Sequence, residues 1–304
     1  MKTAKNVFLI LTAALIFIAH VSGLKTPVSW EYRPESKIND ISVSDTGIAA
    51  VALQDSTILL LDKEKTERRI ALDVPAKTVG ISTDGKTFFV VVADVLTKYD
   101  SAGTIIWSRK LENTINKISL SDSNIAVAAN CNKKNVINEC NTTYLFDKEG
   151  SLVWAQLKGW GAVDIDISPE GGYLVVIYEV KKSFLFNKNA DTLFEIKSTV
   201  ATDGQMFDVA VFSGGNIAAG FQEGLRALNN FKDSEPRASW FYRTDSKVVG
   251  VDSVGTGEYT SAIARRFEQI DYKTERGYDF RGCCAIYLVE AKALWAGSSS
   301  SIIG

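Results

Sequence analysis

The stretch Tyr-Leu-Phe-Asp-Lys-Glu-Gly-Ser-Leu-Val-Trp, residues 144–154, decides the fold of this chain of 304 residues. A short strand ends at Asp147, a turn containing Gly150 follows, and a second strand carries Trp154. Asp and Gly favour tight turns, because the Asp side chain accepts hydrogen bonds from the turn and Gly adopts positive φ. The stretch therefore predicts a strand–turn–strand unit, which residues 99–107 (YDSAGTIIW) repeat.

Three markers of this unit recur in step along the chain. An apolar residue followed by an acid or amide ends one strand: Leu61-Asp62, Tyr99-Asp100, Phe146-Asp147, Phe186-Asn187, Leu228-Asn229 and Val289-Glu290. An aromatic residue follows several positions later, with Trp30 beginning the series: Trp107, Trp154, Phe194, Trp240 and Trp295. The first full unit departs from this pattern, because its aromatic position falls near Arg69. A serine precedes a turn at intervals of 38 to 47 residues: Ser44, Ser82, Ser121, Ser168, Ser213 and Ser253.

Each repeat holds about four short strands in about 40 residues, and no amphipathic helix is indicated outside the N-terminal region. A propeller, a solenoid and a long sandwich all have strands at this spacing, and four strands per unit favour the propeller. The sequence therefore predicts an all-β fold over residues 24–296, a β-propeller of about six four-stranded blades. A truncated propeller of seven or eight blades is the alternative.

The stretches 99–107 and 144–154 resemble the repeat of PQQ-like propellers, in which a strand ending in Asp leads through a Gly turn to a tryptophan strand. The chain is also similar to the WD-like repeat proteins of archaeal and bacterial surfaces, without the Gly-His and Trp-Asp pairs of true WD repeats. The resemblance extends over roughly residues 27–296 and implies an exported surface propeller. It assigns no function, because propellers have many unrelated activities.

Ring closure is ambiguous in the sequence. Trp30 and Trp295 occupy the same repeat position at opposite ends, where a closed ring of six blades needs only one strand. Either one end lies outside the ring, or the natural chain has further repeats. Residues 297–304 have no repeat character and are expected to be a flexible or truncated tail.

The N-terminus is typical of an export signal. Lys2 and Lys5 precede the apolar run 7–21, and Val21-Ser22-Gly23 offers short residues for cleavage. We expect residues 1–23 to be a signal peptide and the body to be extracellular or on the cell surface. An uncleaved anchor is the alternative, and it would be the only contact with a membrane.

Composition excludes several function classes. The net charge of −2 provides no basic field for nucleic acid. The only histidine, His20, lies inside the signal, so the mature chain lacks Ser-His-Asp and Cys-His catalysis and histidine metal ligands. We therefore expect no catalytic residue, cofactor or metal ligand.

Two repeats carry insertions between their second and third strands, at residues 130–142 and about 267–282. Equivalent loops lie on one face of a propeller, where binding commonly specialises. Tyr272, Tyr278 and Arg281 are the candidate binding residues in the second insertion.

The four cysteines accompany these insertions. Cys131 and Cys140 are expected to form a disulfide at the base of the first insertion, with two buried thiols as the alternative. Cys283 and Cys284 form either a vicinal disulfide or two thiols, and some PQQ quinoproteins carry such a pair beside their cofactor. No calcium ligand set or catalytic carboxylate accompanies them here, so a structural role is expected. Asn141, in Asn141-Thr142-Thr143, is a candidate glycosylation site.

Asp40, Asp164 and Asp166 precede the serine turns on strands expected to line the central channel. They either face a cation or polar ligand or accept hydrogen bonds from loop amides. The leading hypothesis is a non-catalytic, exported propeller that binds a protein or a cell-surface assembly. The alternatives are a small-ligand or sugar sensor and, with less support, a PQQ-type quinoprotein or a carboxylate-based enzyme.

Overall fold

The computed structural model describes residues 32–290, with the exception of several short segments. These are residues 33, 63, 65–66, 132–140, 158, 179–181, 198–205, 223, 230–236, 244–246, 254–258 and 267–282. Residues 36–304 belong to one compact unit, and all the strands below lie in it. The expected signal peptide and the tail lie outside the described residues, so both stay predictions.

The described chain forms five four-stranded antiparallel sheets and one three-stranded sheet, each in sequential strand order. Blade one holds β1 (Ile38–Val43), β2 (Ala49–Leu53), β3 (Thr57–Leu61) and β4 (Glu67–Ala71). Blade two holds β5 (Thr78–Ile81), β6 (Thr87–Val92), β7 (Val95–Asp100) and β8 (Ile105–Lys110). Blade three holds β9 (Thr114–Leu120), β10 (Asn124–Asn130), β11 (Thr142–Asp147) and β12 (Leu152–Leu157).

Blade four holds β13 (Ala162–Ile167), β14 (Tyr173–Tyr178), β15 (Lys182–Asn187) and β16 (Thr192–Lys197). Blade five holds β17 (Asp208–Val211), the short helix η1 (Ser213–Gly215), β18 (Ile217–Gly220), β19 (Gly224–Asn229) and β20 (Arg237–Arg243). The sixth sheet holds β21 (Lys247–Ser253), β22 (Tyr259–Arg266) and β23 (Cys283–Glu290).

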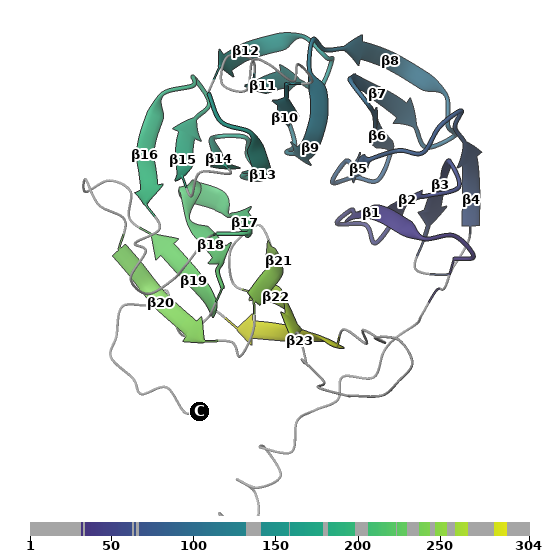
Figure 1. The fold of residues 1–304 in the computed structure, drawn as a ribbon. Helices are drawn as coiled ribbons and strands as arrows, with labels where there is room; N and C mark the ends of the chain where they lie inside the picture. The colour runs from purple at the N-terminus through teal and green to yellow at the C-terminus, as the bar shows by residue number, and fades with distance from the viewer. Residues whose placement is uncertain are drawn as a thin grey trace, which may run out of the picture. The chain divides into compact units, whose positions relative to one another are not determined.

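The sheets are arranged as propeller blades. Their first strands face the centre and contact one another in succession, while the fourth strands lie at the periphery (Figure 1). The predicted all-β propeller is confirmed, with five blades complete and three strands described for the sixth. The expected fourth strand of that sheet, around Trp295, lies outside the described residues.

The hydrophobic core lies between blades rather than inside one central cluster. The second strands carry it, because alternate residues point to opposite faces of a sheet. In β6, Phe88 and Val90 pack against blade one, whereas Phe89 and Val91 pack against blade three. Equivalent clusters join blades three and four and blades four and five. This two-sided burial explains why these strands read as continuous apolar runs in the sequence.

The recurring serines close the turn between the first and second strands. Each serine Oγ accepts the backbone N–H of a residue at or just before the start of the second strand, at 2.9–3.1 Å. The pairs are Ser44 with Ile48, Ser82 with Thr87, Ser121 with Asn124 and Ser168 with Tyr173. We refer to these four turns as the serine turns.

The recurring acid or amide closes the turn between the third and fourth strands. Asp147 Oδ1 accepts the backbone N–H groups of Glu149 (3.1 Å) and Ser151 (2.7 Å). Asp100 and Asn187 make the same two contacts in blades two and four. A side-chain oxygen that satisfies two turn amides explains why only Asp or Asn ends this strand in the three blades. We refer to these three turns as the Asp turns.

The repeated aromatic residue packs under the next blade. Trp107 lies against Gly150 and its indole Nε1 donates to Lys148 O (3.3 Å). Trp154 donates in the same way to Lys188 O (3.0 Å). In blade one the residue that packs in the position of the repeated aromatic is Ile70, next to Arg69. Its side chain packs under Gly103. The departure of the first unit is therefore an aliphatic residue in the aromatic position.

Three glycine substitutions separate the cost of backbone conformation from the cost of this packing. Gly150 has φ +83°, and a Cβ there would lie 2.9 Å from Trp107. We expect Gly150→Ala to destabilise the fold by about 2–4 kcal/mol, from positive φ and overpacking together. Gly47→Ala, with φ +82° and an open surrounding, should cost only about 1–2 kcal/mol.

Gly172→Ala is the control, because a Cβ there makes only an ordinary contact of 3.6 Å with Glu170. Urea denaturation of the three variants measures the order. Equal losses for Gly150→Ala and Gly47→Ala would show that Trp107 yields to the added methyl group.

Candidate functional site

The first strands enclose a central cavity of about 430 Å³, which extends to the serine turns, where Asp45 and Thr83 line it. Besides Asp45, its charged lining comes from four strands: Asp40 on β1, Lys117 on β9, Asp164 and Asp166 on β13, and Asp208 on β17. The three channel residues expected from the sequence thus line one cavity, together with a lysine and an aspartate that were not expected.

A repeated bulge sets the level of these side chains. The register of the first strand shifts just before Asp40, Lys117 and Asp164 in β1, β9 and β13. Each of these residues stands four positions before its serine, at Ser44, Ser121 and Ser168. The distance of four residues from Ser121 is therefore the sequence signal by which Lys117 could have been recognised as a channel residue. Asp208 has the equivalent strand position, but Phe212 stands four positions after it and the serine of its repeat, Ser213, stands five positions after it.

The channel carboxyl groups join neighbouring blades. Asp40 Oδ2 accepts the N–H of Val79 (3.0 Å) across the junction of blades one and two. Asp208 Oδ2 accepts the N–H of Val251 (2.5 Å) in the sixth sheet. These acceptors satisfy amides on the open edge of the next first strand.

Blades four and five are joined twice. Asp164 Oδ2 accepts the N–H of Val209 (3.2 Å), and Asp166 Oδ2 accepts the N–H of Val211 (2.7 Å). Ser119 Oγ also donates to Asp166 Oδ1 (2.5 Å), so Asp166 bridges three blades. The partners are strand amides of the next blade, where the sequence had indicated loop amides or a ligand.

Burial governs the charge state of these carboxyls. It raises the pKa of Asp166 to about 7 and, together with the charge and hydrogen bond of Asp164, that of Asp208 to about 9. Burial also raises the pKa of Asp164, which is 6% exposed. Asp164 and Asp208 form a hydrogen-bonded pair, in which the charge of Asp164 disfavours ionisation of Asp208.

Lys117 is the cation of this cluster. Burial alone would lower the pKa of its ammonium group, but the charges of Asp40, Asp164 and Asp208 outweigh that cost and raise it. Its Nζ lies 3.9 Å from Asp40 Oδ1. The lysine is therefore charged and compensates the carboxylates around it.

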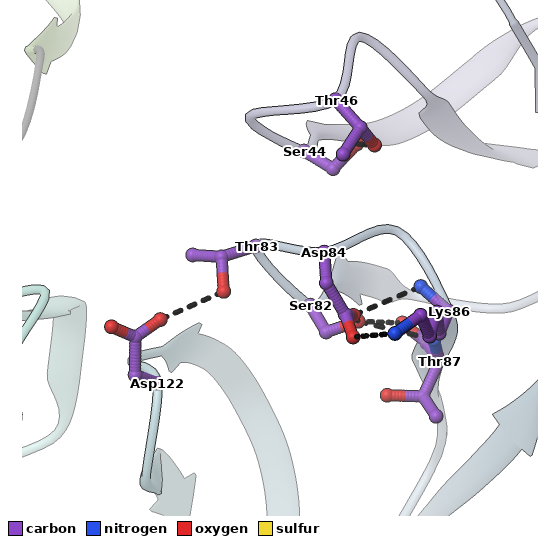
Figure 2. A network of polar contacts seen from close by, with 8 residues as sticks. All are labelled: Ser44, Thr46, Ser82, Thr83, Asp84, Lys86, Thr87 and Asp122. Atoms are coloured by element: carbon purple, nitrogen blue, oxygen red, sulfur yellow. Dashed lines mark hydrogen bonds and ion pairs between the residues drawn. The ribbon is translucent and has the colours of Figure 1, made fainter.

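A second set of contacts joins the serine turns at one mouth of the channel. The Asp45 N–H donates to Thr83 O (3.1 Å), and Thr83 Oγ1 donates to Asp122 Oδ1 of blade three (2.7 Å). Figure 2 shows this reach from Thr83 to Asp122, beside the Ser82–Asp84–Thr87 turn. The Asp122 N–H donates in turn to Pro169 O of blade four (3.0 Å). Polar turn residues that sequence patterns assign to solvent thus link blades one to four.

The first insertion leaves the end of β10 and returns at β11, as expected from the sequence. The Cys131 N–H donates to Asn141 Oδ1 (2.9 Å), which holds the two ends of the insertion together. Asn141 is 5% exposed, so a glycan on its Nδ2 would require this side chain to become more exposed. Cys140 lies outside the described residues, and the disulfide stays a prediction.

The second insertion joins β22 to β23, also in the expected position. Cys283 and Cys284 begin β23, which pairs with Arg266 and Arg265 of β22. Their oxidation state is untested. Tyr272, Tyr278 and Arg281 lie outside the described residues, so their expected role in binding stays a prediction.

Within the described part of the chain, no group of three or more His, Cys, Asp or Glu side chains is arranged as a metal site. The described residues likewise include no helix that is both long and apolar enough to cross a membrane.

Comparison with known proteins identifies the fold class. No protein family model and no curated protein matches the sequence. The structure is similar to a chain of Kuenenia stuttgartiensis hydrazine synthase, with a TM-score of 0.62 and 14% identity over 74% of this chain and 80% of that chain. It is also similar to the Dos1 propeller, with a TM-score of 0.58 and 10% identity over 75% of this chain and 66% of that one. These similarities establish a β-propeller and nothing finer.

The raised carboxyl pKa values predict a stability that falls with rising pH. Between about pH 4 and 7 the folded protein retains a proton on Asp166 (pKa about 7), and between about pH 4 and 9 it retains one on Asp208 (pKa about 9), whereas an unfolded chain with an ordinary pKa of 3.8 releases both. Each retained proton lowers the free energy of unfolding by about 1.4 kcal/mol per pH unit. Urea denaturation at about pH 5, 7 and 9 measures this slope.

Asp208→Asn is the matched variant, because its amide oxygen still accepts the Val251 N–H but does not titrate. We expect it to flatten the slope between pH 7 and 9, while Asp73→Asn, an exposed carboxyl, leaves the slope unchanged. An unaltered slope in Asp208→Asn would mean that Asp208 ionises normally.

Proposed function

We propose that the chain is an exported, non-catalytic β-propeller of the PQQ-like repeat type that acts as a protein-interaction or cell-surface assembly module. The observation that carries this proposal is the use of the channel carboxyls. Asp40, Asp164, Asp166 and Asp208 each accept an amide of the next blade. Groups that hold blades together are poorly placed to act as catalytic acids and bases.

The position of the two insertions supports binding on one face. Successive strands of a blade run antiparallel, so the serine turns and the Asp turns lie at one end of the ring. The connections between second and third strands lie at the opposite end. Both insertions, 130–142 and about 267–282, are such connections and depart from an otherwise regular repeat.

A quinone cofactor does not fit the described residues. In the PQQ class the cofactor needs a calcium ion held by carboxylate and amide oxygens. The channel carboxyls that could supply ligands, Asp40, Asp164, Asp166 and Asp208, are each already bonded to a backbone amide of the next blade. The resemblance therefore concerns the repeat and not the chemistry.

Intact-mass measurement tests export and the absence of a cofactor together. The secreted protein is soaked with calcium and PQQ, exchanged into a volatile buffer, and weighed under native and denaturing conditions. We expect a chain lacking residues 1–23 and no retained ligand. Retained quinone or calcium, lost in Asp166→Asn, would overturn the non-catalytic assignment.

Replacing the first insertion tests the binding face. Residues 133–139 are exchanged for a Gly-Ser linker that leaves Cys131, Cys140 and Asn141 in place. We expect unchanged circular dichroism and thermal midpoint, but loss of proteins crosslinked to the propeller on the surface of its own cells. The control exchanges the exposed turn 101–102 at the opposite end. Equal crosslinking by all variants would contradict binding at this face.

A small-ligand sensor is the second candidate, and the channel cavity favours it. Its volume of about 430 Å³ suits a monosaccharide-sized molecule. Lys117 and the carboxyls around it offer charged donors and acceptors for hydroxyl groups. Thermal-shift measurements with hexoses and amino sugars, repeated on Lys117→Met, would distinguish this candidate by a shift that the variant loses.

A further inference from the structure

Blade one, as the structure describes it, lacks a bulge that blades two to five share. In β8, β12, β16 and β20 the register shifts just before the repeated aromatic residue. That residue then stands opposite the one two positions before the Asp or Asn, as Trp107 stands opposite Lys98. Between the described strands β3 and β4 the register does not shift, and Arg68 takes the equivalent position opposite Leu60. Blade one therefore departs from the repeat in its backbone as well as in its residue.

Two side chains of blade one divide the contacts that one tryptophan makes in blade two. Trp107 packs against the turn glycine of the next blade and donates from Nε1 to Lys148 O (3.3 Å). Ile70 makes the packing contact in blade one. Arg68 makes the polar contact, because its Nη1 donates to Ser101 O, the counterpart of Lys148 O. The indole at the junction of blades two and three thus has no counterpart at the junction of blades one and two.

A cavity of about 270 Å³ lies beside Arg68 at the junction of blades one and two. Leu60 and Ser101 line it, and their counterparts in the next junction pair with Trp107 and accept its N–H. The cavity therefore lies where the next junction holds its indole. An engineered cavity of about 150 Å³ is enough to bind benzene, so this one has room for a two-ring aromatic group. Its remaining apolar and turn lining consists of Ile48, Leu61 and Gly85.

Charged groups of both signs line the same cavity. Glu67 is bonded to Arg69. Arg68 forms no ion pair with a described residue and uses one of its five N–H groups on Ser101 O. The remaining N–H groups suit a carboxylate, which a guanidinium binds through two parallel hydrogen bonds. Asp62 adds a carboxyl group that can accept hydrogen bonds from an ammonium group. An apolar wall beside charges of both signs matches an amino acid with an aromatic side chain.

We propose that the junction of blades one and two is a binding site for a free aromatic amino acid, with tryptophan the best fit. The ring occupies the cavity against Leu60, the carboxylate is bound by Arg68, and the ammonium group faces Asp62. The residues that line this site are not those of the channel cavity. The inference goes beyond the proposed function and does not depend on it.

An amide NMR titration of the protein with L-tryptophan tests the site at single-residue level. We expect shifts at Gly85 and Ser101, which line the cavity, and none at Gly150, where Trp107 already lies. L-Alanine lacks the ring and indole lacks both charged groups, so each should bind at least about tenfold more weakly. Equal binding of L-alanine, or unchanged Gly85 and Ser101 signals with L-tryptophan, would overturn the proposal.

Substitutions at Arg68 test the ring and the charge separately. Arg68→Gln removes the charged donors and should weaken tryptophan binding about tenfold. Lys110→Gln, which removes an exposed charge outside the cavity, is the control and should leave the affinity unchanged. Arg68→Trp fills the cavity with an indole of the protein itself and should abolish binding, with the fold checked by circular dichroism.

If Arg68→Trp does not fold, the comparison of Arg68→Gln with Lys110→Gln decides the question. Equal affinities of these two variants for tryptophan would show that Arg68 does not bind the carboxylate and would count against the site.

Discussion

The structure depends on one constraint: a four-stranded sheet with two apolar faces can bury them only against its neighbours. Phe88 and Val90 of β6 need blade one, and Phe89 and Val91 need blade three. Hydrophobic burial is not directional, so it could tolerate sheets that slide past one another. The acceptors on the first strands remove that freedom, because Asp40 or Asp166 can reach only one amide of the next blade. Apolar contact thus supplies the driving force, and the inner-strand hydrogen bonds fix the angle and height at which blades meet.

Much of this could be predicted from the sequence because its markers have local causes. The serine turns and the Asp turns are closed by side chains that bond amides a few residues away, so spacing alone reveals them. The contacts of the channel residues were harder to predict from the sequence. Asp40, Asp164 and Asp166 were identified as channel-facing, but their partners belong to another blade, about one repeat away. Lys117 was missed because a lysine on an alternating strand is ordinarily a solvent-facing residue, and only its distance from Ser121 marks it. Asp208 was missed because the marker serine of its repeat, Ser213, stands five positions after it instead of four.

The channel shows how an acidic centre can be compatible with a stable fold. Four carboxyls of the first strands and one lysine line a cavity of about 430 Å³. The carboxyls would repel one another strongly if all of them ionised. Burial raises the pKa of Asp164, Asp166 and Asp208, which disfavours their charged forms, and Lys117 compensates Asp40. The same arrangement makes these residues effective as blade connectors, and it is the basis of the proposal that the chain is non-catalytic.

The contact between Trp107 and Gly150 has a consequence for how such a chain can change over time. The two residues lie about one repeat apart and belong to different blades, as do Ile70 and Gly103. A duplication or recombination event that inserts one repeat must therefore supply a large apolar side chain to the following blade and a glycine to the preceding one. Whole copies satisfy both needs at once, whereas mixed repeats from unrelated propellers would bring a bulky residue against a side chain that leaves it no room. The heritable module is then the junction between two blades, and growth by whole-repeat duplication is the route that preserves it.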